Sequence, residues 1–302
     1  MKKTTTFISL LLTCTLLLSS TPLILGNTTF ASASTGAANF LPNAYYAPPY
    51  GFDTANETAL SLATAAYITS ILSSRYPCYA CYGASCTVPN YRTITSALQN
   101  YDKAVVFSKG HRTKDVLLGY THTGLIASDH YTYPDGTVDY FGYFDYDIYG
   151  RTSSKNVVTF MWHCQTVDDY TPGASHFDVL GYAFSLPFAW THNSNMPKYG
   201  TIGSQVYLGW KDKPNYTLPN GTSLTVGSPQ YEWAIKNNNY MSCNFANVAA
   251  SYWYYMNQGY TTTTALNQLS KDMYGSNINF ASNTELYNWL VVYGNMDMGL
   301  PW

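Results

Sequence analysis

Short, continuous hydrophobic runs recur along the chain and are separated by segments of different periodicity. The clearest runs are Lys103–Arg112 (KAVVFSKGHR), Asn156–Trp162 (NVVTFMW) and Ser204–Trp210 (SQVYLGW), and a similar pattern lies around Leu290–Tyr293. Apolar runs of this length that lack regular alternation are typical of strands buried on both faces. The pattern therefore predicts buried strands at these four places.

Amphipathic segments with helical spacing lie between and after these runs. They are Glu57–Pro77, Thr93–Tyr101, Cys243–Gly259 and Thr261–Gly275, of which the last two end at glycines suited to close a helix. A tyrosine-rich section separates the first two strands, and its Pro134–Gly136 has the composition of a turn. We expect a hairpin of exposed or edge strands there.

Helices interleaved with short buried strands favour an α/β fold. Such strands form a mostly parallel sheet flanked by helices on both faces. Ligands collect at the carboxyl ends of the strands in sheets of this kind. His111 and Cys164 both follow a predicted strand directly, so they are the first candidates for a functional site.

The amino-terminal segment resembles a secretory signal peptide. Lys2 and Lys3 precede an apolar run over Phe7–Leu18, and Ala31–Ala33 (ASA) offers a small-residue cleavage site. The run is about a dozen residues long, short of the roughly 18 to 20 that span a bilayer. We therefore expect residues 1–33 to be a signal peptide and residues 34–302 to form a single domain, secreted, extracellular or wall-associated, without a membrane span.

The net charge argues against a nucleic-acid partner, and the absence of known binding motifs argues against a metal or cofactor. Loss of Lys2 and Lys3 leaves 13 of 15 basic residues against 17 acidic ones, a net charge of −4 (13 − 17), so no nucleic-acid partner is expected. No HExxH, GxSxG or phosphate-binding glycine loop is present, and we expect no metal and no cofactor. Calcium is the one alternative, because acids are scattered through the hairpin region, at Asp135, Asp139, Asp145 and Asp147.

The cysteines suggest disulfides and one thiol left over. After removal of Cys14 with the signal, five remain: Cys78, Cys81, Cys86, Cys164 and Cys243. In an oxidising compartment an odd count leaves one thiol unpaired within the chain. The first three crowd into CYACYGASC, where a structural staple is the simplest interpretation and a zinc site would need a fourth ligand. If Cys243 pairs within that group, Cys164 is the remaining thiol.

Cys164 and His111 have the chemistry of a nucleophile and its acid–base partner. The thiolate is the reactive form of cysteine, and a nearby imidazolium favours it. If the two strands are adjacent, their backbones lie about 5 Å apart and the side chains can meet. The spacing of 53 residues (164 − 111) is close to that of peptidases whose histidine lies about 50 residues before the cysteine.

The order of these elements resembles the caspase, gingipain and legumain group of cysteine peptidases. The resemblance rests on TITSALQNYDKAVVFSKGH, VVTFMWHC, VYLGW and VVYGN. It implies a caspase-like three-layer sandwich that cleaves peptide or protein substrates by acyl transfer, with Cys164 as nucleophile and His111 as acid. It also implies an oxyanion hole made by the backbone N–H groups of Cys164 and Arg112. Two motifs depart from the group: Gly110 precedes the histidine where a glycine usually follows it, and QTVDD follows the cysteine.

Other residues leave alternatives open. Asp168 and Asp169 could favour a basic substrate side chain or be solvated turn carboxylates. His163 should point to the face opposite Cys164, which suits a packing or surface residue. A substitute base or a metal ligand could come from the histidines in loop-like sequence, at His122, His130, His176 and His192.

A silent relative of the peptidases is the second functional class. Cys164 could be a small buried residue without chemistry, since unpaired cysteine is among the most buried residue types. The 30 tyrosines would then serve a surface binding or assembly module. The discriminating feature is whether Cys164 is reduced, accessible and within reach of His111.

Overall fold

The computed structural model describes residues 35–42, 54–110, 112–117, 120–149, 151, 155–163, 166, 184, 199–201, 203–210, 215–217, 223–225, 245–287 and 290–302. Residues 1–33, His111, Cys164, Asp168 and Asp169 lie outside these ranges, and so do Cys243, His176 and His192.

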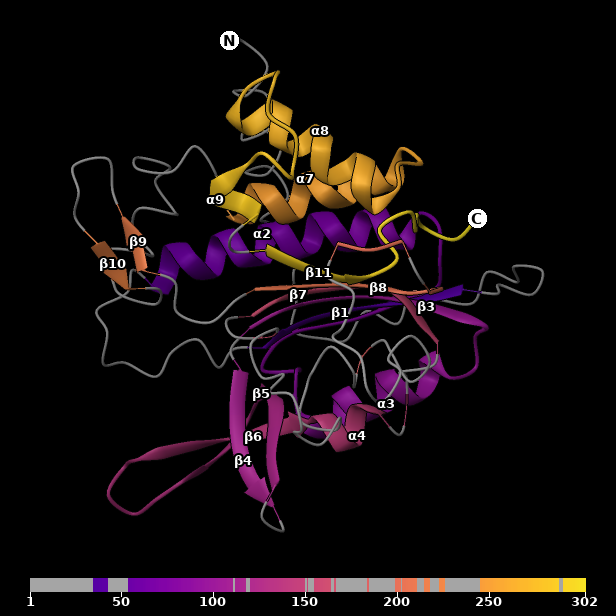
Figure 1. Ribbon diagram of the computed structural model, residues 1–302. Helices are drawn as coiled ribbons and strands as arrows, with labels where there is room; N and C mark the ends of the chain where they lie inside the picture. Colours follow the sequence, from indigo (N-terminus) through magenta and orange to yellow (C-terminus); the bar gives the residue numbers. More distant parts are fainter. Residues whose placement is uncertain are drawn as a thin grey trace.

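A six-stranded sheet forms the centre of the molecule (Figure 1). Its strand order is β11-β8-β7-β3-β1-β2, and all neighbours run parallel except β11 and β8. The bounds are β1 Thr35–Pro42, β2 Cys78–Gly83, β3 Lys103–Lys109, β7 Asn156–Trp162, β8 Val206–Trp210 and β11 Leu290–Gly294. The four strands expected from the hydrophobic runs are therefore confirmed, and two more complete the sheet.

β1 and β2 are the strands that the hydrophobic pattern did not indicate. β1 is buried along its whole length between β3 and β2, yet its sequence TGAANFLP is rich in small and polar residues. Small residues are needed there because a Cβ on Gly36 would lie 2.6 Å from the Tyr101 ring. Asn39 is fully buried and donates to the Ala65 carbonyl at 2.9 Å. Close packing, and not hydrophobicity, explains the composition of this strand.

Helices cover both faces of the sheet (Figure 1). α2 (Thr54–Ser73), α7 (Phe245–Asn257), α8 (Thr262–Tyr274) and the short α9 (Thr284–Tyr287) lie on one side, and α3 (Val88–Leu98) and α4 (Asp145–Tyr149) lie on the other. α3 begins earlier than its predicted Thr93, because Thr87 caps it by accepting from the Asn90 N–H. The expected α/β fold, with a mostly parallel sheet between two helical layers, is confirmed.

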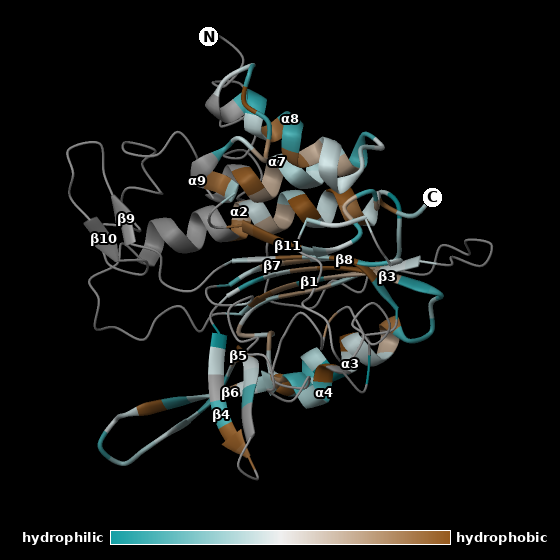
Figure 2. Cartoon of the chain, in the orientation of Figure 1, coloured by the Kyte–Doolittle hydropathy of each residue, from teal (hydrophilic) through white to brown (hydrophobic). Residues whose placement is uncertain are grey.

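The alternation of side chains along the strands gives each helical layer its own hydrophobic core. Phe107 of β3 and Phe160 of β7 pack with Trp253 of α7 on one face. Val106 and Met161, one residue along each strand, belong to the core on the α3 side. Figure 2 shows the resulting concentration of hydrophobic residues along the strands between the layers.

A smaller antiparallel sheet lies below the six-stranded sheet in the view of Figure 1, near the carboxyl ends of its parallel strands. It has the order β4-β5-β6, with bounds Arg112–Leu117, Tyr120–Thr132 and Val138–Phe144. β5 and β6 are the predicted hairpin around Pro134–Gly136, whereas β4 was not expected. β9 (Asn215–Thr217) and β10 (Ser223–Thr225) form a separate pair. In the described part of the chain, no helix is long and apolar enough to cross a membrane.

Alkaline pH should destabilise the fold through buried tyrosines. Burial raises the pKa of Tyr76 to about 12 and raises the pKa of Tyr252 as well. In the unfolded chain these phenols ionise near pH 10, so the folded state holds their protons longer. Their stabilising contribution is complete below pH 10 and is lost as pH rises from about 10 towards 12. Denaturant unfolding between pH 8 and 11.5 should show a falling midpoint.

The control for this prediction is Tyr252→Phe, which removes one ionisable hydroxyl and keeps the ring. The variant should lose less stability than the parent between pH 10 and 11.5. A midpoint that stays constant over this range in the parent chain would contradict the assignment.

Candidate active site at the carboxyl end of the sheet

The two strands that precede the candidate residues are direct neighbours. β3 and β7 pair in parallel, with Ser108 opposite Met161 and Lys109 opposite Trp162. The ladder extends one step further, because the Gly110 N–H donates to the Trp162 carbonyl at 3.2 Å. The condition that the two strands be adjacent is therefore met. The next residue along the first strand is His111, and Cys164 follows His163; both remain predictions, as neither is among the described residues.

His163 is held beneath the end of the sheet by a serine of the neighbouring strand. Its side chain is 1% exposed, and its Nε2 lies 2.7 Å from the Ser108 Oγ, with which it shares a hydrogen bond. Ser108 lies on the α3 face, as does Met161, so His163 continues that face. Of the two roles considered for His163, packing and surface, the structure shows packing.

Gly110 is required by the close approach of His163. A Cβ at Gly110 would lie 2.8 Å from Cε1 of the His163 ring and 3.1 Å from Cγ of Pro42. Both distances are shorter than an ordinary carbon–carbon contact. The glycine before His111, which departs from the pattern of the peptidase group, thus has a local packing reason.

Thr166 anchors the chain two residues beyond Cys164. It is 2% exposed, its N–H donates to the Trp210 carbonyl at 3.0 Å, and its Oγ1 accepts from the Trp210 N–H at 3.0 Å. The Tyr207 hydroxyl donates to the Thr166 carbonyl at 3.1 Å. Residues 163 and 166 are therefore both fixed, one to β3 and the other to β8. The sequence analysis missed Thr166, because a single threonine after a strand carries no signal of its distant partners.

A cation lies at the same end of β3. Lys109 is only 4% exposed, and its Nζ lies 4.6 Å from the centre of the Trp162 ring on β7. A cation over an indole face is stabilised by the negative charge of the ring surface. Trp162 packs against the core on the α2 and α7 side, so the pair lies on the face opposite Ser108.

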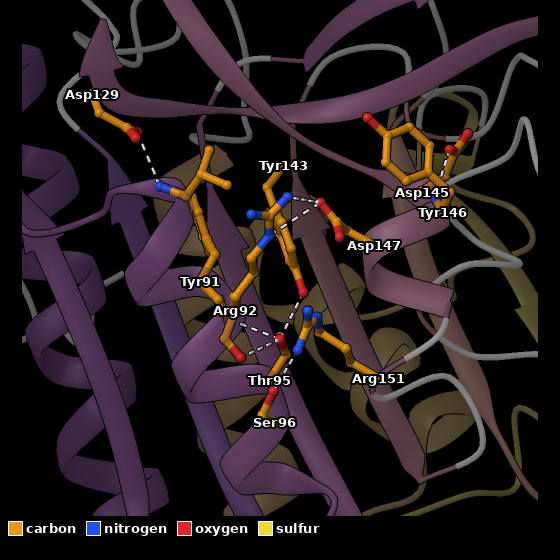
Figure 3. A network of polar contacts seen from close by, with 11 residues as sticks. Tyr91, Arg92, Thr95, Ser96, Asp129, Tyr143, Asp145, Tyr146, Asp147 and Arg151 are labelled. Atoms are coloured by element: carbon orange, nitrogen blue, oxygen red, sulfur yellow. Dashed lines mark hydrogen bonds and ion pairs between the residues drawn. The ribbon is translucent and has the colours of Figure 1, made fainter. Parts of the chain in front are cut away.

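The three-stranded sheet is joined to the six-stranded sheet through contacts with α3. Figure 3 shows the contacts: Arg92 forms an ion pair with Asp147 at 2.6 Å, and the Tyr143 and Thr95 hydroxyls lie 2.6 Å apart. The Tyr143 ring also stacks on Tyr91, with centroids 5.2 Å apart. These contacts attach β6 and α4 to α3. Because β6 pairs with β5 and β5 pairs with β4, they also support β4, which begins at Arg112.

The two contacts at the ends of α3 complete this attachment (Figure 3). Asp129 of β5 accepts from the Val88 N–H, the first residue of the helix, at 3.0 Å. Arg151 donates to the Ser96 Oγ at 2.7 Å near the last turn. A carboxylate at a helix N-terminus is also stabilised by the positive end of the helix dipole.

His122 lies in a strand, so its assignment to a loop was wrong. It is on β5 opposite Asp115 of β4, with Nδ1 2.8 Å from Oδ1 of the buried Asp145. Burial raises the pKa of Asp145. Arg112 begins β4, and Asp115 is three residues further, about 10 Å along an extended strand. His122 therefore orders the small sheet and does not lie beside the end of β3. His130 is likewise in β5, not in a loop.

Three of the four acidic residues considered for calcium have separate protein partners. Asp135 accepts from the Thr137 N–H within the hairpin turn, and this hydrogen bond lowers the pKa of Asp135. Asp145 contacts His122, and Asp147 forms an ion pair with Arg92. Among the described residues, no three His, Cys, Asp or Glu side chains converge as a metal site.

Thr166→Val should loosen the chain after β7. Valine has the shape of threonine but leaves the buried Trp210 N–H without its side-chain acceptor, which costs about 1 to 3 kcal/mol in unfolding free energy. Thr166→Ser keeps the oxygen and should lose less than half of that. Denaturant unfolding measures both, and equal losses in the two variants would count against the hydrogen bond.

Gly110→Ala should be destabilising because of the His163 ring. Overpacking of this kind costs about 1 to 3 kcal/mol. If the ring is the cause, the Gly110→Ala change should be much less costly in a His163→Ala background, a coupling that a double-mutant cycle of unfolding free energies measures. Strict additivity of the two changes would contradict the contact.

Comparisons with known proteins add a distant structural similarity. No protein-family model matches the sequence, and no curated protein matches it. Among solved structures, the Drosophila initiator caspase Dronc is similar to this chain with 8% sequence identity and a TM-score of 0.33. The similarity covers 88% of this chain and 80% of the caspase chain.

Proposed function

We propose that the chain is a secreted cysteine endopeptidase in which Cys164 and His111 form a catalytic dyad. The observation that carries the proposal is the register of β3 and β7. The two strands pair side by side to Lys109 and Trp162, and the ladder extends to Gly110. Each strand then leads within one or two residues to one member of the dyad. Neighbouring strands lie about 5 Å apart, a separation that an imidazole and a thiol can bridge.

The surroundings suit thiolate chemistry. If the alternation of each strand continued for two more residues, His111 would share the face of Lys109 and Cys164 the face of Trp162. A cation close to a cysteine favours the thiolate over the thiol. Lys109, which is held over the Trp162 ring, would supply such a charge in addition to the imidazolium of His111.

The proposed reaction is acyl transfer. The Cys164 thiolate attacks the peptide carbonyl, His111 gives its proton to the leaving amine, and water then hydrolyses the acyl-enzyme. The backbone N–H groups of Cys164 and Arg112 would stabilise the oxyanion. Asp168 and Asp169 would favour a basic substrate side chain. The anchored positions 163 and 166 support this reaction, since a nucleophile between two fixed points loses little entropy on reaching its target.

A surface on the small sheet favours a second function, that of a binding or assembly module without catalysis. Large hydrophobic side chains are exposed on β4, on the β5–β6 hairpin and on α4: Val116, Leu117, Tyr131, Tyr133, Val138, Phe141 and Tyr146. Exposed aromatic and aliphatic groups in this number mark interaction surfaces. On this alternative, Cys164 would be unreactive.

Labelling with a thiol-directed peptidyl electrophile separates the two functions. The mature protein should be modified at Cys164 in a one-to-one ratio at neutral pH, and Cys164→Ser should abolish the adduct. His111→Ala should slow labelling by about 100-fold or more, as expected for loss of an acid–base partner. Peptide mapping by mass spectrometry locates the adduct, and a set of peptides with acidic, neutral and basic residues tests the role of Asp168 and Asp169.

The chain provides its own controls. Burial raises the pKa of the Cys78 thiol to about 12 and raises that of Cys86, so both should remain unmodified in the folded protein. His130→Ala changes an exposed histidine of β5 and should leave the rate unchanged. Absence of an adduct at Cys164, or equal labelling rates in the parent and His111→Ala, would overturn the dyad.

A further inference from the structure

Two cysteines meet where β2 turns back towards α3. Cys81 lies near the end of β2 and is 3% exposed, and Cys86 lies just before the helix and is fully buried. The Cys86 thiol donates to the Cys81 carbonyl at 2.7 Å. Both thiols are reduced in the structure. The two cysteines thus lie side by side in the buried core on the α3 side.

The turn between them is closed by its own backbone. The Ser85 N–H donates to the Tyr82 carbonyl at 3.2 Å, and the Cys86 N–H donates to the Gly83 carbonyl at 3.0 Å. Gly83 has a φ of 56°, in the left-handed region that favours glycine. The turn therefore brings the chain back so that the Cys86 side chain contacts the backbone of Cys81.

The third cysteine of the cluster faces the other way. Cys78 is three positions before Cys81 on the same strand, and an odd separation along a strand places two side chains on opposite faces. The packing agrees, because Cys78 contacts the core on the α2 side and Cys81 belongs to the core on the α3 side. Of the three cysteines in the described part of the chain, strand geometry thus places Cys81 and Cys86 on the same side of the sheet.

We propose that Cys81 and Cys86 form an intrachain disulfide in the exported protein. Each thiol loses its proton, one sulfur–sulfur bond forms, and two electrons pass to an oxidant of the disulfide class, which is reduced to two thiols. The exchange proceeds through a mixed disulfide between one cysteine and the oxidant. This pairing leaves Cys78, Cys164 and Cys243, an odd number, so one thiol still remains unpaired within the chain. The pairing does not depend on the activity of Cys164.

Burial determines when the bond forms. Both side chains are shielded in the folded chain, and burial and the neighbouring Cys81 raise the pKa of the Cys86 thiol, so the thiolate that must attack is scarce. Oxidation therefore belongs to folding, before α3 covers the turn. Once formed, the bond fixes a turn that also carries β5, because Ser128 donates from its N–H to the Cys86 carbonyl at 2.8 Å and from Oγ to the Gly83 carbonyl at 2.7 Å.

Refolding of the full chain in a glutathione redox buffer tests the pairing. The product is blocked with an alkylating agent under denaturing conditions and cleaved with chymotrypsin without reduction. Cleavage after Tyr79 and Tyr82 separates Cys78, Cys81 and Cys86 into three fragments. We expect the fragments that contain Cys81 and Cys86 to be linked to each other. Alkylation of both Cys81 and Cys86, or a link from either of them to Cys78, Cys164 or Cys243, would overturn the proposal.

Thermal unfolding provides a second readout. Reduction of the refolded protein should lower the Tm by about 5 °C, because a short closed loop restricts the unfolded chain. The same reductant-dependent shift should persist in Cys78→Ala and vanish in Cys81→Ala. Because the readout is the difference with and without reductant, a general loss of stability in a variant does not disturb it. A shift that persists in Cys81→Ala would refute the assignment, whatever the peptide-labelling result at Cys164.

Discussion

The in-register parallel pairing of β3 with β7 is the constraint on which the rest of the structure depends. Side chains alternate between the two faces of a sheet, so a slip of one residue would exchange the helix layers that each strand contacts. Phe107 would then lose its contact with Trp253 and Phe160 its contact with Tyr252. The Ser108–His163 hydrogen bond could not form either. The same register determines which residues leave the sheet side by side at its carboxyl end.

Polar contacts define the positions of the residues at the carboxyl end of the sheet, which hydrophobic packing alone would not do. Hydrophobic burial is not directional, whereas a hydrogen bond requires a particular donor and acceptor. Ser108 orients His163 from β3, and Thr166 binds the backbone of Trp210 on β8. The chain between them is short and anchored at both ends. Our proposal of a nucleophile at Cys164 draws on this geometry, because a reactive thiol needs a defined position.

The three-stranded sheet, α3 and the turn before α3 are joined by direct polar contacts. Tyr143 and Asp147 attach β6 and α4 to the side of α3, and Asp129 attaches β5 to its first turn. Ser128, next to Asp129, contacts the turn that carries Cys86. A disulfide at that turn would therefore strengthen the junction between the main sheet, the helix and the segment that follows His111. The proposed modification and the proposed active site would share this support.

Local sequence determined the elements with strong patterns, and only the tertiary structure decided how they pair. The runs at Asn156–Trp162 and Val206–Trp210 and the two carboxyl-terminal helices could be predicted because hydrophobic periodicity acts within a few residues. β1 could not, since its small residues are selected by the Tyr101 ring and by α2.

For the same reason the candidate site could be predicted only in part. The sequence placed His111 and Cys164 after strands, but the adjacency of those strands depends on backbone hydrogen bonds between residues some 50 positions apart. Asp145 reaches His122 across 23 positions, and Thr166 reaches Trp210 across 44. Sequence patterns record the environment of each residue along the chain, whereas such contacts exist only after the chain has folded, and they decide which polar side chains order the site.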